Sequence, residues 1–231
     1  MSFDLIKRQS WQGREEWFFQ KDLTETYESW YEGRYKKAEV LQKKVIGDLV
    51  KKDERIKDIL EFGCGTSRFT RWWNKIGITA TGSDISPFML GQAVKLFGGD
   101  LVLAESAHMP YQDKMFDAVA FITTFEYYPD PVAVIREAAR VGKHGIIFGM
   151  IHKVTTTTIR RRVQQFFGKN PFYNTATFYT LNRLKRVIDE ALKGEKYSIF
   201  WQCTGLPRWF LVDEWHLPYG DFLGVYVRRE N

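Results

Sequence analysis

Short apolar runs alternate with amphipathic stretches along most of this chain. The apolar runs predict strands, and stretches with apolar positions three or four residues apart predict helices. The first predicted strand is the short apolar run between Asp58 and the glycines at Gly63 and Gly65. The others are Ile76–Gly82, Leu101–Ala104, Phe116–Ile122 and Gly145–Ile151, with a closing pair at Lys196–Cys203 and Asp221–Arg229. The predicted helices are Leu23–Val50 (one or two), the stretch through Trp72 and Trp73, Pro87–Phe97, Pro131–Arg140, Thr155–Phe167 and Leu181–Leu192.

This alternation is typical of an α/β fold with a mostly parallel sheet. Phe116–Ile122 is apolar at every position except Asp117, as in a strand that helices cover on both faces. The length of 231 residues suits one such domain.

The composition is that of a globular protein and excludes a disordered or collagen-like chain. Hydrophobic residues make up 44% and charged residues 27%, which is enough apolar surface for a core. The two cysteines, Cys64 and Cys203, form neither a disulfide framework nor a metal-ligand pattern. No apolar run approaches the ~20 residues of a membrane span, so we expect no span, no metal and a cytoplasmic location.

Positive charge is concentrated in the last third of the chain. Residues 151–231 hold 13 basic and 7 acidic side chains, so the net charge of +6 lies there. The stretch Ile151–Ile188 holds Lys153, Arg160, Arg161, Arg162, Lys169, Arg183, Lys185 and Arg186 and no acid. This stretch is either a solvated basic face or a surface that attracts an anionic partner.

A glycine turn follows the first predicted strand and carries the chemical signal. Gly63 and Gly65 supply a tight turn before a helix, and Asp84 follows Gly63 by 21 residues at the end of the second strand. A carboxylate in that place suits the two hydroxyls of a ribose. A dinucleotide turn would need a third glycine where this chain has Arg68, which disfavours a pyrophosphate ligand.

The pattern Glu61-x-Gly63-x-Gly65 instead resembles the first motif of class I S-adenosylmethionine-dependent methyltransferases. The resemblance extends over roughly residues 23–229, in the small-molecule branch that includes ubiquinone- and menaquinone-type methyltransferases. Its further segments are Tyr27–Tyr35, Ala104–Tyr111, Phe116–Tyr127, Arg136–Val141 and Asn170–Thr180. Glu105 and Ser106 depart from the usual Asp-Ala pair, and Lys143-His144-Gly145 shortens a usual glycine-containing turn.

The resemblance implies a Rossmann-like, seven-stranded, mostly parallel sheet with helices on both faces. It also implies an N-terminal helical segment and a lid inserted after the fifth strand. The chain would be a single methyltransferase domain over 1–231. Its parts would be an N-terminal helical cap (1–57), a cofactor-binding core (58–152), a lid (153–180) and the C-terminal part of the sheet (181–231).

The same resemblance implies roles for individual residues. S-adenosylmethionine would contact the turn glycines Gly63 and Gly65, with Glu61 orienting the turn and the methionine amine. Asp84 would bind the ribose, Ile85 and Met89 would flank the adenine and ribose, and Glu105, Ser106 and Ala107 would contact the adenine. Thr123, Tyr27, Trp30 and Arg34 would face the methionine part and the sulfonium. The product would be S-adenosylhomocysteine.

The acceptor side is less defined in the sequence. His152 follows the fifth strand and Tyr173 lies in the predicted lid, so both are candidate substrate-binding residues. We assign no catalytic residue, because displacement at a sulfonium methyl needs alignment and exclusion of water more than a reactive side chain. We expect a small-molecule acceptor of anionic character. Alternatives are RNA (tRNA) methylation, cofactor binding without turnover and an NAD-dependent oxidoreductase. The oligomeric state stays open.

Overall fold

The computed structural model describes residues 16–33, 35–153, 163, 171–173, 175–204 and 220–230. Its centre is a seven-stranded sheet of strand order β3-β2-β1-β4-β5-β7-β6. The strands are β1 (Asp58–Phe62), β2 (Thr79–Asp84), β3 (Leu101–Leu103), β4 (Phe116–Ile122), β5 (Gly142–Ile151), β6 (Tyr197–Cys203) and β7 (Phe222–Arg229). The first five pair in parallel, whereas β7 runs antiparallel to both β5 and β6. The predicted Rossmann-like, mostly parallel sheet is therefore confirmed.

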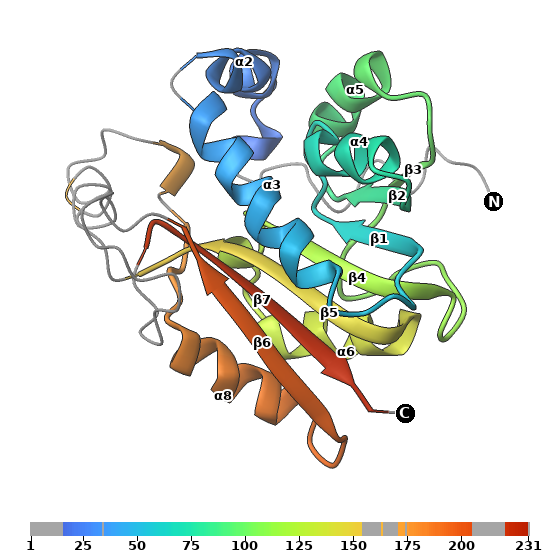
Figure 1. Cartoon of the computed structure of the whole chain (residues 1–231). Helices are drawn as coiled ribbons and strands as arrows, with labels where there is room; N and C mark the ends of the chain where they lie inside the picture. The colour runs from blue at the N-terminus through green and yellow to red at the C-terminus, as the bar shows by residue number, and fades with distance from the viewer. Residues whose placement is uncertain are drawn as a thin grey trace.

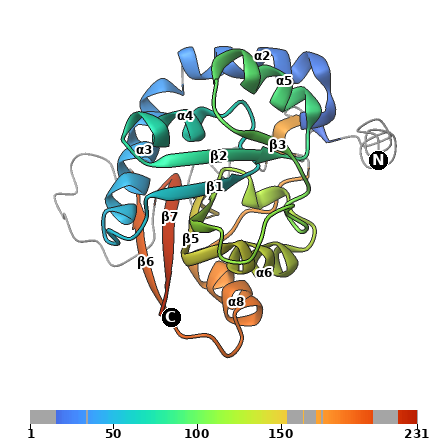
Figure 2. The ribbon, with the colours of Figure 1, turned by 90° about the vertical axis from the view of Figure 1, so that its right-hand side faces the viewer.

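Helices cover both faces of this sheet (Figure 1). The α-helices are α2 (Lys21–Glu32), α3 (Lys36–Val50), α4 (Arg68–Lys75), α5 (Pro87–Leu96), α6 (Pro131–Val141) and α8 (Leu181–Ala191). Three short 3₁₀ turns complete the described elements: η1 (Trp17–Phe19), η2 (Phe125–Tyr127) and η3 (Pro171–Tyr173). Figure 2 places α3 and α4 on one side of the sheet and α6 and α8 on the other.

Each face of the sheet has its own core, because successive strand residues point to opposite sides. Ile59 of β1 belongs to the cluster under α3 and α4, which includes Ile46 and Trp73. Its neighbour Leu60 belongs to the cluster under α6 and α8, which includes Ile135. The continuous apolar run of β4 is thus buried from both sides, as its sequence predicts.

Three helices begin with a side-chain N-cap of a residue type that commonly occupies this position. A hydroxyl or carboxylate accepts a backbone N–H three residues ahead, which satisfies one orphan donor of the first turn. These caps are Ser86 to Met89 N at 3.2 Å, Asp130 to Ala133 N at 2.9 Å and Thr180 to Arg183 N at 3.2 Å. Proline occupies the first turn of α5 and α6, where its missing N–H costs nothing.

Two predicted strands begin three residues away from their predicted start, and the other boundaries differ by at most two residues. β2 begins at Thr79 rather than Ile76, because Ile76–Ile78 close the end of α4 and Gly77 takes a left-handed conformation (φ +85°). β5 begins at Gly142 rather than Gly145, because Gly142 pairs with Phe116 across an irregularity in the register. Apart from Val163, the predicted helix Thr155–Phe167 lies outside the described residues, as does most of the predicted lid.

Candidate functional site

The turn between β1 and α4 is the centre of the candidate site. Gly63 and Gly65 have φ values of +67° and +55°, a region that favours glycine. A Cβ at Gly63 would lie 2.1 Å from Thr124 Oγ1. The loop after β4, to which Thr124 belongs, therefore leaves no room for a side chain at Gly63. A Cβ at Gly65 would meet only Met89 Sδ, at 4.0 Å. Gly63 is therefore closed in by protein, whereas Gly65 faces open space.

Asp84 is the last residue of β2 and lies directly against this turn. Its Oδ2 accepts the N–H of Gly65 at 2.8 Å, and its Oδ1 accepts the N–H of Ser86 at 2.8 Å. Burial raises the pKa of Asp84 to about 6, although these hydrogen bonds oppose the shift. The carboxylate is thus mostly ionised at neutral pH, and it keeps lone pairs for a further pair of donors.

Glu61 lies on β1, two residues before Gly63, and is also buried. Its Oε2 accepts the hydroxyl of Thr70 at 2.6 Å. Burial, with a smaller contribution from the charge of Asp84, raises the pKa of Glu61 to about 8. Burial therefore raises the pKa of both carboxyl groups in the site, and it raises the pKa of Glu61 further above its ordinary value than that of Asp84.

Aromatic side chains from η1, α2 and η2 form the opposite side of the site, here called the aromatic wall: Trp17, Phe18, Tyr27, Tyr31 and Tyr127. Trp17 and Tyr27 stack at 5.4 Å between ring centroids, and Phe18 meets Tyr127 edge-on at 5.9 Å. The hydroxyls of Tyr27 and Tyr31 lie 3.1 Å apart. Burial raises the pKa of Tyr27, Tyr31 and Tyr127, so the wall presents neutral phenols.

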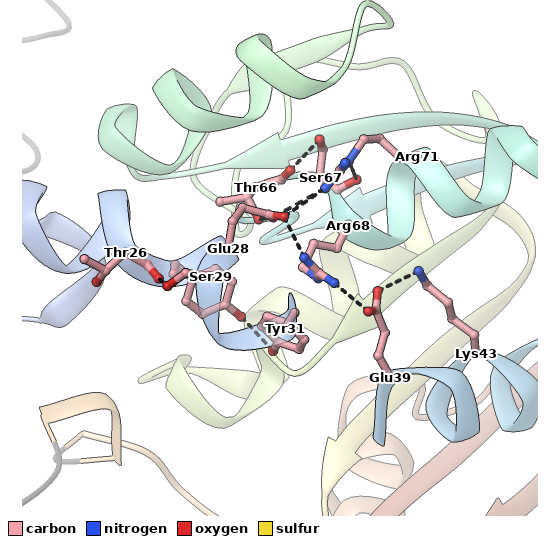
Figure 3. A network of polar contacts seen from close by, with 11 residues as sticks. Thr26, Glu28, Ser29, Tyr31, Glu39, Lys43, Thr66, Ser67, Arg68 and Arg71 are labelled. Carbon is pink, nitrogen blue, oxygen red and sulfur yellow. Dashed lines mark hydrogen bonds and ion pairs between the residues drawn. The ribbon is translucent and has the colours of Figure 1, made fainter. Parts of the chain in front are cut away.

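A cluster of charged side chains, here called the Arg68 cluster, joins α2 and α3 to α4: Glu28, Glu39, Lys43, Arg68 and Arg71 (Figure 3). The guanidinium of Arg68 donates to Glu28 at 2.6 Å and to Glu39 at 2.5 Å. Arg71 reaches Glu28 at 3.3 Å, and Lys43 reaches Glu39 at 2.6 Å. Glu28 also accepts the hydroxyl of Thr66, a residue of the glycine turn.

Between the glycine turn and the aromatic wall lies a cavity of about 330 Å³. Eleven of the predicted site residues line it: Tyr27, Glu61, Gly63, Gly65, Asp84, Ile85, Met89, Glu105, Ser106, Ala107 and Thr123. The sequence thus brings residues from four strand ends and one N-terminal helix to a single cavity.

Four predicted site residues are placed elsewhere or not described. Trp30 packs against Phe172, with ring centroids 4.0 Å apart, and does not line the cavity. Tyr173 contacts Phe178 at 5.9 Å. His152 is buried in a bridge with Tyr179, and burial lowers its pKa. Neither lines the cavity, so their substrate roles stay predictions, and Arg34 lies outside the described residues.

Several lining residues were not predicted. Trp17, Phe18, Tyr31, Thr66, Arg68, Thr124, Tyr127 and Tyr128 all face the cavity. Position gives a signal for some of them, because Thr66 and Arg68 directly follow the glycines and Tyr127 and Tyr128 follow β4. Tyr128 shares a 2.8 Å hydrogen bond with Ser106, which ties the loop after β4 to the loop after β3.

Comparisons with known proteins point to one family. The family model of a methyltransferase domain matches residues 60–149, the segment from β1 to β5 that holds the glycine turn and Asp84. An uncharacterised protein of Methanocaldococcus jannaschii is 30% identical over 169 residues, which cover 72% of this chain and 76% of that protein.

A demethylmenaquinone methyltransferase of Tropheryma whipplei is 29% identical over 161 residues. That match covers 68% of this chain but 62% of the relative, so the chain spans less than two thirds of it. Among solved structures, an S-adenosylmethionine-dependent methyltransferase from Thermotoga maritima is similar with a TM-score of 0.75 and 21% identity. The alignment covers 93% of this chain and 99% of that one. At this identity the likeness shows the fold.

Proposed function

We propose that this chain, which belongs to the S-adenosylmethionine-dependent methyltransferases, methylates a small-molecule acceptor in the cavity between the glycine turn and the aromatic wall. One observation carries this proposal: a single cavity of about 330 Å³ is lined by an open glycine turn, by the buried acidic side chain of Asp84 at the end of β2 and by a wall of aromatic side chains. A volume of this order suits a small ligand.

The residues around the turn fit the nucleoside end of the cofactor. Asp84 uses one lone pair on each oxygen for Gly65 and Ser86, so it has acceptors left for a ribose diol. The open space at Gly65 permits a close approach of the ligand to the backbone. We assign the adenine to Glu105, Ser106 and Ala107, in the loop after β3.

The remaining lining residues fit the other parts of the cofactor. Ile85 and Met89 supply apolar surface beside the adenine and ribose. Glu61, Thr123 and Tyr27 are assigned to the methionine part. When bound, S-adenosylmethionine supplies an electrophilic methyl group on a sulfonium. The neutral rings of Tyr27 and Tyr127 place aromatic surface near positive charge, which is favourable, and the aromatic wall excludes competing water.

Positioning carries the proposed chemistry, and no side chain is assigned as the base. The cofactor would supply its methyl group to a lone pair of the acceptor as the bond between methyl and sulfur breaks, and the electron pair of that bond would stay on the sulfur of S-adenosylhomocysteine. A proton that the acceptor gives up goes to solvent. Alignment of the two reactants can supply several kcal/mol of the barrier reduction, on the order of 7–11 kcal/mol in favourable cases.

We further propose that the acceptor is anionic, because the stretch Ile151–Ile188 holds eight basic residues and no acid. Arg183 of this stretch lies over the ring of Tyr179, 5.0 Å from its centroid, and Tyr179 pairs with His152. The contact of His152 and Tyr173 with the acceptor stays a prediction, because neither residue lines the cavity. Arg160, Arg161 and Arg162 lie outside the described residues.

In the part of the chain that the structure describes, the helices are too short or too polar to span a membrane.

The test uses S-adenosylmethionine labelled in its methyl group. The protein is incubated with a metabolite extract that has been separated by mass and by charge, and with total RNA in a parallel reaction. We expect label in an anionic fraction of low mass, with none from the Gly65→Val variant. Label in a neutral or cationic fraction would refute the anionic acceptor alone. Label confined to RNA would refute the small-molecule proposal.

A further inference from the structure

Arg68 stands out among the cavity residues because its side chain contacts three separate groups of the N-terminal helices. It is the first residue of α4, directly after the glycine turn. Its guanidinium donates to Glu28 of α2 and Glu39 of α3 and lies over the ring of Tyr31, 4.0 Å from the centroid. The planar fork of an arginine can make these contacts together, which a lysine ammonium cannot.

The ion pairs of Arg68 are shielded from water. The side chains of Arg68, Glu39 and Glu28 are 17%, 11% and 25% exposed. Pairs shielded to this degree are screened less than surface pairs, and removal of one partner leaves the other charge poorly compensated. The cluster therefore resists rearrangement more than an exposed pair would.

From Arg68 a chain of contacts runs along the aromatic wall. Tyr31 shares a hydrogen bond with Tyr27, and Tyr27 stacks on Trp17 with an interplanar angle of 22°. These three rings line the cavity, as does Arg68 itself. The position of the guanidinium thus sets the position of the nearest phenol ring, and through it the rest of the wall.

A second tie joins the same helix to the turn. Glu28 accepts the hydroxyl of Thr66, next to Gly65, as well as the guanidinium of Arg68 (Figure 3). The helix α2 is thus fixed at two points, Thr66 and Arg68, on the C-terminal side of the two glycines. A ligand that holds Thr66 and Arg68 in these positions would also stabilise the contacts of α2 with the turn, and by linkage these contacts would favour the ligand.

We propose that Arg68 is a positioning residue that holds the aromatic wall over the cavity and couples cofactor binding to closure of α2 on the glycine turn. This inference rests on the proposed function, because it takes the S-adenosyl group as the occupant of the cavity. Arg68 acts through Tyr31, Tyr27 and Glu28 and takes no part in the methyl transfer.

The test measures S-adenosylhomocysteine binding and local opening together. Calorimetric titration gives the affinity, and hydrogen exchange of the peptide 21–32 reports the closure of α2, with the peptide 181–191 as an internal reference. The variants are Arg68→Gln, Arg68→Lys and the control Arg71→Gln. Arg71 shares Glu28 at 3.3 Å but is absent from the residues that line the cavity.

We expect Arg68→Gln to weaken S-adenosylhomocysteine binding about tenfold or more, because Glu28 and the ring of Tyr31 then lose the guanidinium that holds them beside the cavity. Arg71→Gln is expected to weaken it by less than about threefold, as for a longer and more exposed pair. The ligand should slow exchange of 21–32 in the wild type and in Arg71→Gln but not in Arg68→Gln. Arg68→Lys should restore stability without restoring this protection.

A purely structural tie gives a different result. Faster exchange of 181–191 to the same degree as 21–32 in Arg68→Gln, or retained ligand protection of 21–32, would overturn the coupling. If Arg68→Gln does not fold, Glu39→Gln decides in its place, because it removes one anchor of Arg68 without altering a residue that lines the cavity. Failure of the wild type to bind S-adenosylhomocysteine would overturn the proposed function as well, whereas normal binding by Arg68→Gln overturns this inference alone.

Discussion

The two glycines of the turn make a matched pair for testing which of them faces the cofactor. We expect Gly65→Ala to lose ligand affinity with a moderate loss of stability, and Gly63→Ala to lose mainly stability. Both replacements place an L side chain at a positive φ (+55° and +67°), which costs roughly 1–2 kcal/mol. The difference between them comes from what the new Cβ meets.

At Gly63 the new methyl would lie 2.1 Å from Oγ1 and 2.8 Å from Cβ of Thr124, so the loop after β4 must move. Such overpacking adds about 1–3 kcal/mol, for a total of about 2–5 kcal/mol out of a typical 5–15 kcal/mol of stability. At Gly65 the nearest atom is Met89 Sδ at 4.0 Å, so the backbone penalty stands alone. The methyl there enters the space of the ligand and is expected to weaken its binding by about 1–3 kcal/mol, the same overpacking term.

Urea denaturation followed by circular dichroism measures the stability of both variants, and calorimetric titration with S-adenosylhomocysteine measures their affinity. Wild-type affinity in a folded Gly65→Ala protein would refute the placement of the cofactor on this backbone. Equal losses of stability in the two variants would refute the steric conflict between a side chain at position 63 and Thr124.

Three further predictions concern buried polar groups. Asp84→Ala should weaken S-adenosylhomocysteine binding by about 1–3 kcal/mol, the cost of a lost charged partner, and unchanged calorimetric affinity in a folded variant would contradict the ribose assignment. Glu61 has a folded pKa of about 8 against an ordinary 4.5, so the folded state holds more protons between these values. Its stabilising contribution is present below pH 4.5 and is lost as the pH rises to 8. Relative to Glu61→Gln, the wild type should thus lose up to ~1.4 kcal/mol of unfolding free energy per pH unit in urea titrations, and parallel pH profiles would refute this. Tyr226→Phe removes a 2.7 Å hydrogen bond to Asp53 and should lower the unfolding free energy by about 1–3 kcal/mol with no change in ligand affinity, and a changed affinity would show that this face of the sheet communicates with the site.

The parallel part of the fold could be predicted because its signals are local. The buried strand β4 has the boundaries that its apolar run predicts, and β1 is the apolar run that precedes the glycines. The first turns of α5 and α6 contain the prolines at which those helices were predicted to begin. The neighbourhood of Asp84 and Gly65 follows from the same logic, since parallel strands end at one edge of the sheet. Where a boundary was wrong, as at the start of β2, a left-handed glycine had extended the preceding turn.

The N-terminal side of the site could not be predicted in the same way. The partners of Arg68 lie 40 and 29 residues away along the chain, and no periodicity specifies which glutamates they are. In the sequence, Arg68 was notable only because it occupies the position of the third glycine of a dinucleotide-binding turn. Trp17 and Phe18 line the cavity because η1 packs beside α2 and α5, which is a result of tertiary packing and not of a motif.

The place of β7 in the sheet has a consequence for the order of folding. β6 precedes β7 in the chain, yet it lies at the end of the strand order and joins the sheet through β7. During synthesis β6 therefore leaves the ribosome before β7, the strand with which it pairs. About 70 residues separate β5 from β7, its antiparallel neighbour. Tyr226 closes a still longer loop by bonding Asp53, 173 residues upstream. The half of the sheet that holds the glycine turn can thus assemble while the chain is still being made. The other half is complete only after β7 (residues 222–229), the last strand to be synthesised, has paired with β5 and β6. We therefore expect the pairing of β7 to be the slow step of folding.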